Sequence, residues 1–316
     1  MELAVGIDLG GTAIKGGLVT AEGAIVHRAS IATRAAEGVD AVIDRIAELA
    51  EALHRHAAAR HEAPVGIGVG TPGTIRRSDG VVISAPNLPG WTNIPLAAEL
   101  SNALGVSVLV NNDANNAALG EFACGAGRGL NDMVMLTLGT GVGGGVICNG
   151  QLYVGSTGNA AELGHVIVQP GGRRCNCGQL GCLEAYSSAA TTAQRAQEAI
   201  DAGTRSILQR ILDEGQVISA EDVVRAAASG DATASQVWGE TCRYLALACI
   251  NFQHVFDPDC IVLAGGMSDA GEQLLAPVNK AVAEMISPTL SPPPRIKLAE
   301  LGNDAGFVGA ALSVLR

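Results

Sequence analysis

The chain has 316 residues, of which 48% are hydrophobic, 3% are aromatic and 41 are glycines, and its formal net charge is −11. This composition is typical of a globular protein of about two domains with a core of small aliphatic side chains. The acidic balance, with no more than two basic residues in a row, argues against nucleic acid and anionic membranes as partners. No apolar stretch approaches the roughly twenty residues that span a bilayer, and the N-terminus lacks the basic segment of a signal peptide, so a cytoplasmic protein is expected.

The first part of the chain predicts a strand meander followed by helices and further strands. Short apolar runs broken by glycine turns predict strands at 3–7, 14–19 and 25–31. Apolar residues at three- and four-residue spacing predict an amphipathic helix over 37–60. Further strands are expected at 65–70, 81–84 and 106–110, with a helix at 96–104.

The second part repeats this plan. A helix over 114–122 is followed by a strand at 133–138, a glycine turn at 139–145 and a strand at 146–148, which matches the strand, turn and strand at 3–19. Helices are expected between 187 and 256, a strand at 260–264, a helix at 271–286, a proline-rich connection at 288–294, a strand at 295–301 and a last helix from about 305. Two related halves of mixed strands and helices indicate an α/β protein whose glycine turns meet in one interdomain cleft.

A cluster of possible metal ligands lies in the second part of the chain, between the strand expected at 146–148 and the helices expected from 187. His165, Cys175, Cys177 and Cys182 fall within 18 residues and supply the four ligands that tetrahedral zinc prefers, with no open position, so the zinc would be structural. A reduced metal-free set, a disulfide with one spare thiol, and an ordinary core histidine at 165 are the alternatives; a cytosolic location disfavours the disulfide. Glu162 and Glu184 flank the cluster. A loop that fixes two separated glutamates and a histidine in this way would suit a polyhydroxylated ligand.

Two glycine turns follow strands in equivalent places. The first comprises Asp8, Gly10, Gly11 and Thr12 with Lys15 nearby, and the second comprises Gly139, Thr140 and Gly141. Backbone N–H groups that converge at such turns bind anions, so the pair predicts a triphosphate held from both sides. Neither turn is a Walker loop, because no Gly-Lys-Ser/Thr follows. Asp8 is placed to reach Mg²⁺ through water.

Asp113 ends a buried strand and opens a helix, which allows two interpretations. As an N-cap it would contribute about 1 kcal/mol to stability. Opposite a phosphate site it would be a general base for a substrate hydroxyl, since phosphoryl transfer needs positioning, charge stabilisation and a carboxylate that accepts the nucleophile's proton.

Taken together, these motifs resemble the ROK family of sugar kinases and repressors, and most of all its bacterial glucokinases. The resemblance covers nearly the whole chain. It is carried by the following segments: Asp8 to Thr12, Gly70-Thr-Pro-Gly73, Asn87-Leu88 with Trp91, Asn111 to Asn116, Leu138 to Gly141, Glu162-Leu-Gly-His165, Cys175 to Glu184, and Ala264-Gly-Gly-Met267. The combination of Glu-x-Gly-His with Cys-x-Cys-Gly-x-x-Gly-Cys-x-Glu is highly specific.

The resemblance implies an actin-like fold of two ribonuclease-H-like domains, 1–112 plus 302–316 and 113–301, because the last helix returns to the first domain. It also implies roles for individual residues. Asp113 would deprotonate the sugar 6-hydroxyl, and Asn112 would hold the neighbouring hydroxyl. Further sugar contacts would come from Gly73, Asn87, Glu162, His165 and Glu184. His165 would coordinate zinc through one ring nitrogen and face the sugar with the other. Gly265 and Gly266 would lie against adenosine.

The function expected from the resemblance is ATP-dependent phosphorylation of glucose at the 6-hydroxyl, with Mg²⁺ bound to ATP, structural Zn²⁺, and a homo-oligomer, either dimer or tetramer. Kinase action on N-acetylmannosamine, N-acetylglucosamine or fructose is an alternative, and so is polyphosphate as the donor, although polyphosphate users of the family generally lack the cysteine loop. A repressor of the family would need a helix-turn-helix ahead of residue 3. Ala161 stands where many relatives carry glycine, and only slightly less backbone freedom is expected from it.

Overall fold

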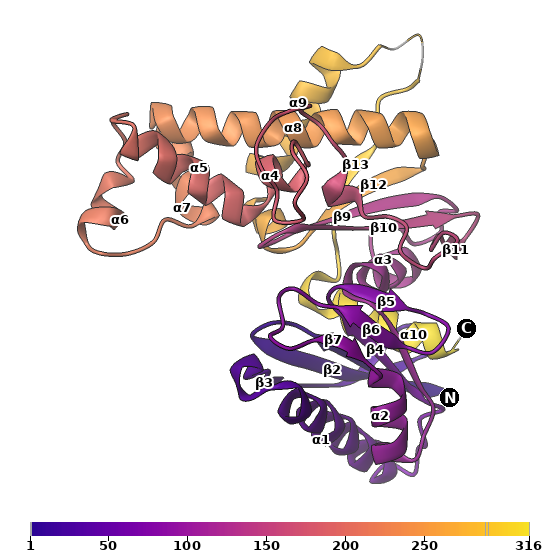
Figure 1. Cartoon of the computed structure of the whole chain (residues 1–316). Coiled ribbons are helices and arrows are strands. Elements are labelled where there is room, and N and C mark those ends of the chain that lie inside the picture. The colour runs from indigo at the N-terminus through magenta and orange to yellow at the C-terminus, as the bar shows by residue number, and fades with distance from the viewer. Residues whose placement is uncertain (1, 288, 290, 316) are drawn as a thin grey trace. The chain divides into compact units, whose positions relative to one another are not determined.

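The structure is a computed structural model, and it describes residues 2–287, 289 and 291–315. The chain divides into two compact units, shown in Figure 1. Unit 1 comprises Met1–Leu130, Gly145–Ala161 and Glu300–Arg316, and unit 2 comprises Asn131–Gly144 and Glu162–Ala299. This division assigns helix α3 (Asp113–Cys124) to unit 1, whereas the sequence suggests that a second domain starts at 113. The limits within which each domain folds independently stay a prediction.

The central element of unit 1 is a five-stranded sheet of order β3-β2-β1-β4-β8. Its strands are β1 (Leu3–Leu9), β2 (Ala13–Thr20), β3 (Ile25–Ala32), β4 (Ile67–Thr71) and β8 (Val108–Asn112). The first three strands pair antiparallel, which confirms the predicted meander, and β4 runs parallel to both β1 and β8. Because parallel strands end at the same edge, Asp8 near the end of β1 and Asn112 at the end of β8 belong to one edge of this sheet.

Helices cover both faces of this sheet (Figure 1). Helices α1 (Val39–Ala58) and α2 (Leu96–Leu104) pack on one face over a core that includes Val5, Ile7 and Leu9. The C-terminal helix α10 (Ala305–Leu315) packs on the other face, against Ala4 and Val19, and α3 packs on α10. Strands β1 and β4, which are covered on both faces, are apolar apart from Asp8 and Thr71.

The contact between α10 and the sheet is unusually close. A Cβ atom at Gly6 of β1 would lie 1.8 Å from the carbonyl oxygen of Phe307, and one at Gly68 of β4 would lie 1.9 Å from that of Ala310. Only glycine permits this approach. Glycine usually weakens a strand, but at these two positions the packing of α10 requires it.

Three short strands form a separate antiparallel sheet in unit 1. They are β5 (Thr74–Arg76), β6 (Val81–Ser84) and β7 (Thr92–Ile94). Trp91, which is 2% exposed, packs beneath this sheet in the same core as α1 and α2. The sheet carries Gly73 and Asn87 on its connections.

Unit 2 contains parallel strands with β12 (Cys260–Ala264) between β9 (Met133–Leu138) and β13 (Ile296–Leu298). The chain leaves β9 through the second glycine turn into β10 (Val142–Cys148). From Gly145 to Ala161 the chain belongs to unit 1, and this stretch includes β11 (Gln151–Leu152), which pairs antiparallel with β10. The remaining helices are α4 (Glu184–Ser187), α5 (Ala189–Asp201), α6 (Gln209–Asp213), α7 (Ala220–Ala228), α8 (Ala232–Phe256) and α9 (Glu272–Met285). In the described part of the chain, no helix combines the length and hydrophobicity needed to cross a membrane.

Several details depart from the sequence-based expectations. The glycine turn expected at 139–145 is shorter, because β10 begins at Val142, four residues before the strand expected at 146–148. The strand expected at 106–110 is β8, which ends two residues later at Asn112. The strand expected at 295–301 is shortened to β13, and the proline-rich connection at 288–294 includes residues 288 and 290, which lie outside the described residues. Ala161 has φ +67°, so it adopts a left-handed conformation that costs an L-residue about 1 kcal/mol, more than the slight effect expected.

Candidate active site and metal centre

The first glycine turn joins β1 to β2. The N–H of Gly10 donates to the carbonyl of Ala13 at 3.0 Å and closes the turn, and the carbonyl of Gly10 accepts the hydroxyl of Thr33 at 2.6 Å. Gly11 and Thr12 are exposed at its tip. The turn therefore presents the Gly11 and Thr12 peptide groups to solvent, as an anion site requires, while Gly10 gives the turn its shape.

Asp8 and Lys15 face each other across β1 and β2, where they are register partners. The pKa of Asp8 is raised to about 7, mainly by burial and next by the charge of Asp113, while the charge of Lys15 acts to lower it. The Lys15 ammonium donates to Asn303 Oδ1 at 2.8 Å. The carboxylates of Asp8 and Asp113 are shielded from solvent and repel each other, and a bound cation would reduce this repulsion.

Asp113 is the first residue of α3, but it is not the helix cap. Asn112 is the cap, because its Oδ1 accepts the N–H of Asn115 at 3.1 Å. Asp113 Oδ1 accepts the N–H of Ala114 at 2.8 Å. Burial raises the pKa of Asp113, and the hydrogen bond from Ala114 opposes this. The capping interpretation of Asp113 is therefore wrong, and Asn112 has that role.

Gly73 and Asn112, both expected at the sugar, come together in unit 1. The Asn112 Nδ2 donates to the carbonyl of Gly73 at 3.2 Å. Gly73 has φ +94°, and a Cβ atom there would lie 2.0 Å from the carbonyl oxygen of Ser84. Asn87, the other expected sugar residue of this unit, is exposed in the connection between β6 and β7.

Sequence reasoning assigned no role to Asn116, although it belongs to the asparagine run 111–116. Its side chain is fully buried, its Oδ1 accepts from Asn111 Nδ2 at 3.2 Å, and its Nδ2 has no acceptor among the described residues. A Cβ atom at Gly70 would lie 3.0 Å from this Nδ2 and 3.6 Å from Asp8 Oδ1. The signal that could have found it is an asparagine on the apolar face of a helix.

The second glycine turn lies in unit 2 at the end of β9. Its shape is set by the Gly139 N–H, which donates to the Gly141 carbonyl at 2.9 Å, and Thr140 is exposed at the tip. Gly265 at the end of β12 has φ +82°, and a Cβ atom there would lie 2.6 Å from the carbonyl oxygen of Leu138. The exposed pair Gly265 and Gly266 therefore lies directly beside this turn, as expected for residues at the ends of neighbouring parallel strands.

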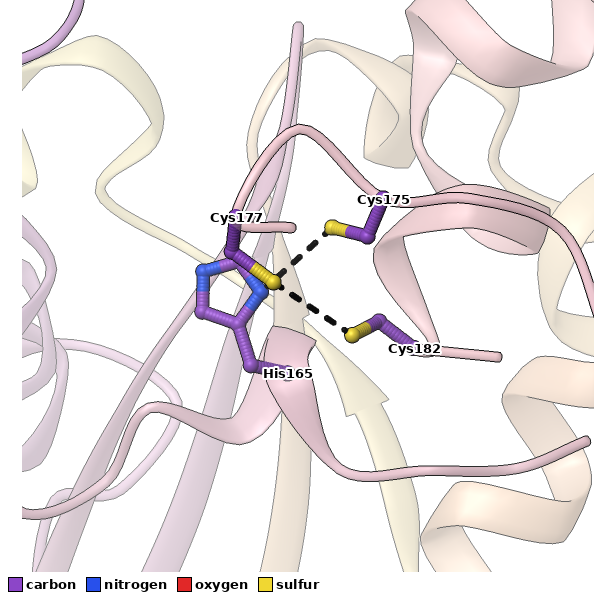
Figure 2. A group of neighbouring side chains, drawn as sticks. All are labelled: His165, Cys175, Cys177 and Cys182. Carbon is purple, nitrogen blue, oxygen red and sulfur yellow. Dashed lines mark hydrogen bonds between the residues drawn. The ribbon is translucent and has the colours of Figure 1, made fainter. Parts of the chain in front are cut away.

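Four side chains converge in a candidate metal centre (Figure 2). The ligand atoms of His165, Cys175, Cys177 and Cys182 all lie within 4.8 Å of one another. Cys177 and Cys182 Sγ are 3.6 Å apart, and Cys175 Sγ is 3.7 Å from His165 Nδ1. Zinc–sulfur bonds of about 2.3 Å in a tetrahedron separate two sulfurs by about 3.8 Å. The residues fit zinc, and the ring of His165 turns Nδ1 toward the cysteines.

The cluster is held by a short knuckle rather than by long elements. Its backbone bonds include Cys175 N–H to Gln179 O at 2.9 Å and Leu183 N–H to Val166 O at 2.9 Å. Burial raises the pKa values of Cys175 and Cys182. Tyr186, which sequence reasoning did not single out, supports the knuckle by accepting the Arg173 N–H at 2.7 Å.

The two glutamates that flank the cluster have different surroundings. Glu162 is exposed just before the 3-10 turn Leu163–His165. Glu184 begins α4 with one oxygen, Oε1, 3.4 Å from Cys175 Sγ, and the other, Oε2, accepting the N–H of Val142 at 2.9 Å. The second contact links the metal loop to the second glycine turn, which the sequence did not predict.

Comparisons with known proteins identify the family of the chain. The ROK family model matches residues 4–316. A glucokinase of Thermotoga maritima is 39% identical over 97% of this chain and 95% of its own length, and a glucokinase of Halalkalibacterium halodurans is 40% identical over 96% and 92%. Among solved structures, a ROK family glucokinase from Streptomyces griseus in complex with glucose and AMPPNP is 34% identical, with a TM-score of 0.82 over 98% of each chain.

Proposed function

The chain belongs to the ROK family, and we propose that it is an ATP-dependent glucokinase that phosphorylates glucose at the 6-hydroxyl. Similarity to glucokinases over nearly the full length supports this activity. The observation in the structure that carries the proposal is that Asn112 caps α3, so the carboxylate of Asp113 is not needed as the helix cap.

Asp113 is the proposed general base. Burial raises the pKa of Asp113, and a carboxylate with a raised pKa is a better proton acceptor for an alcohol than an ordinary one. Asn112 is the proposed contact to the adjacent hydroxyl. Its Oδ1 accepts the N–H of Asn115 and its Nδ2 donates to the carbonyl of Gly73, and these two bonds fix the orientation of the amide group. Gly73 and Asn87 are further sugar contacts in this proposal.

Mg²⁺–ATP is the proposed donor. Gly11 and Thr12 in unit 1, and Thr140 and Gly141 in unit 2, are the proposed phosphate contacts, while Gly10 and Gly139 shape the two turns. Asp8 and Lys15 are the proposed groups that balance Mg²⁺ and phosphate charge, and the exposed Gly265 and Gly266 are the proposed contacts to adenosine. Phosphoryl transfer needs this positioning more than it needs covalent chemistry.

His165, Cys175, Cys177 and Cys182 are the proposed ligands of a structural Zn²⁺, which would neutralise thiolate charge and hold the knuckle in one conformation. His165 would bind through Nδ1, which leaves Nε2 to face a sugar hydroxyl. Glu162 and Glu184 are the proposed partners of the remaining hydroxyls. Reduced thiols and an ATP-dependent reaction are consistent with a cytoplasmic enzyme.

A substrate panel tests the proposal. Purified protein is incubated with ATP or polyphosphate and with glucose, fructose, N-acetylglucosamine or N-acetylmannosamine, and the sugar phosphate is identified by mass spectrometry and by a glucose-6-phosphate dehydrogenase reaction. The expected result is that ATP with glucose has the highest kcat/KM. A higher kcat/KM for an N-acetylated sugar or fructose, or turnover only with polyphosphate, would contradict it. Absence of any turnover together with sugar-sensitive operator binding would indicate a repressor instead.

A further inference from the structure

The backbone N–H and carbonyl of Val142 both contact the segments that carry the metal ligands. On one side, Glu184 Oε2 accepts its N–H at 2.9 Å. At the carbonyl of the same residue, Gly164 approaches so closely that a Cβ atom there would lie 1.9 Å from the oxygen and 2.8 Å from the carbonyl carbon. Gly164 directly precedes His165, and Glu184 lies two residues after Cys182. Val142, which follows the glycine turn directly as the first residue of β10, is therefore held between the two ends of the metal loop.

The other end of the glycine turn is attached to the same part of unit 2. The carbonyl of Gly139 accepts the N–H of Ala189, the first residue of α5, at 2.8 Å. Glu184 and Ala189 stand at the starts of consecutive helices, and the Ser188 side chain caps the second by accepting the Thr191 N–H at 3.1 Å. The turn 139–142 is thus suspended at both ends from the segment 184–189.

Glu184 also contacts a residue of the metal centre. While Oε2 holds Val142, Oε1 lies 3.4 Å from the Sγ of Cys175. The fit is tight, since a Cβ atom at Gly141 would lie 2.4 Å from Oε2. One carboxylate therefore contacts both a metal ligand and the backbone of the turn.

We propose that Glu184 is a positioning residue for nucleotide as well as a sugar contact, and that occupancy of the metal centre and binding of nucleotide phosphate at the turn 139–142 stabilise each other. This inference rests on the proposed function, because it takes the turn to be a phosphate site. The coupling is reciprocal: if the metal tightens nucleotide binding by some factor, nucleotide must tighten metal binding by the same factor.

Hydrogen exchange tests the clamp without any ligand. The Val142 amide is followed in zinc-loaded wild type, in Glu184→Ala and in Glu184→Gln. We expect strong protection in wild type, loss of at least tenfold of it in Glu184→Ala, and partial recovery in Glu184→Gln, whose amide oxygen can still accept the N–H. Equal protection in wild type and Glu184→Ala would overturn the clamp, and this result does not depend on whether the protein is a kinase.

Nucleotide affinity tests the coupling. Calorimetry with Mg²⁺–AMPPNP, in the absence of sugar, is expected to show a Kd at least tenfold higher for Glu184→Ala and for protein stripped of zinc. Glu162→Ala is the matched control, because Glu162 is assigned to the sugar but not to the turn; its Kd for nucleotide should change less than twofold. An unchanged Kd in Glu184→Ala would overturn the proposal. If wild type binds no nucleotide at all, the proposed function fails instead.

A second variant avoids both the metal loop and the sugar contacts. Ala189→Pro removes the N–H that holds the Gly139 carbonyl, and proline suits the first position of a helix. The preceding Ser188 is extended, with φ −82° and ψ 161°, as a residue before proline should be. We expect a higher Kd for Mg²⁺–AMPPNP with an unchanged Kd for glucose. The reciprocal effect is measured as zinc release to a chromophoric chelator, which Mg²⁺–AMPPNP should slow severalfold in wild type and not in Ala189→Pro. Release that is insensitive to nucleotide in wild type would contradict the coupling.

Discussion

Gly306 of α10 lies directly against the carboxylate of Asp8, so closely that a Cβ atom at residue 306 would be 2.6 Å from the Asp8 carboxyl carbon and 2.8 Å from Oδ2. The C-terminal helix, almost 300 residues away in sequence, therefore sets the position of a carboxylate on the first strand. The backbone of α10 forms one wall around Asp8, and there is no room for even a methyl group.

Gly306→Ala should consequently displace Asp8 and weaken the use of Mg²⁺–ATP. We expect the KM for ATP to rise and kcat to fall at least tenfold, with the Kd for glucose changed less than threefold, as measured by steady-state kinetics and calorimetry. Gly239→Ala is the control, since Gly239 is exposed on α8 with open space around its Cα. It should leave activity unchanged and add up to about 1 kcal/mol of stability. Unaltered ATP kinetics in Gly306→Ala would contradict the assigned role of Asp8.

Asp8 should make the protein less stable as the pH rises. Its pKa is raised to about 7 in the folded state from 3.8, so between these values the unfolded chain releases the proton first and the free energy of unfolding decreases. The full penalty, up to about 4 kcal/mol, applies above pH 7 and vanishes below pH 4. Asp8→Asn should thus be more stable than wild type to urea at pH 8 and equal to it at pH 4. Asp213→Asn, an exposed control, should differ from wild type by less than about 0.5 kcal/mol at both pH values.

Asp113→Asn should abolish turnover while glucose binding survives. The variant keeps the shape of the side chain but cannot accept a proton, so we expect kcat to fall at least a thousandfold and the Kd for glucose to change less than fivefold. In wild type, kcat/KM should fall with decreasing pH as Asp113 protonates, and the midpoint should lie above that of an ordinary aspartate because its pKa is raised. Near wild-type turnover in Asp113→Asn would disprove the assignment of the base.

Loss of zinc should cost both stability and sugar affinity. Cys177→Ser leaves three ligands, and the knuckle then lacks the metal that holds its short turns together. We expect a lower Tm, a higher KM for glucose and less than one zinc per chain by elemental analysis. Cys242→Ser serves as a comparison, because this buried cysteine of α8 lies outside the cluster: it should lower the Tm through core packing yet keep the full zinc content. Verified loss of zinc with unchanged Tm and KM would count against a structural metal.

Ala161→Gly should relieve a strained backbone. Ala161 has φ +67°, which costs an L-residue about 1 kcal/mol, whereas glycine adopts this conformation freely but loses more entropy on folding. The neighbouring Ala160→Gly carries only the entropic cost, so Ala161→Gly should be more stable than Ala160→Gly by about 1 kcal/mol in urea denaturation. Equal stability of the two variants would show that residue 161 is not strained in solution.

Much of the fold could be predicted from local patterns. The meander of β1 to β3, the amphipathic helix α1 and the strand β12 follow from apolar periodicity and glycine turns, and the structure confirms them. Apolar periodicity is less informative at strand ends, where a polar residue can still take part in the backbone hydrogen bonding of the sheet. Asn111 and Asn112 of β8 pair with Gly70 and Thr71 of β4, so the strand extends two residues further than expected. The helix cap is Asn112 rather than Asp113.

The candidate site shows the same division. The sequence alone determined the metal cluster, both glycine turns and the likeness to the ROK family, because each depends on residues that lie close together in the chain. Only the tertiary structure decided that α10 forms a wall around Asp8, that Asn116 is buried near it and that Glu184 clamps Val142, 42 residues away. Spacing encodes geometry over a few residues, whereas such contacts depend on how whole helices and strands pack, and no local pattern records that packing.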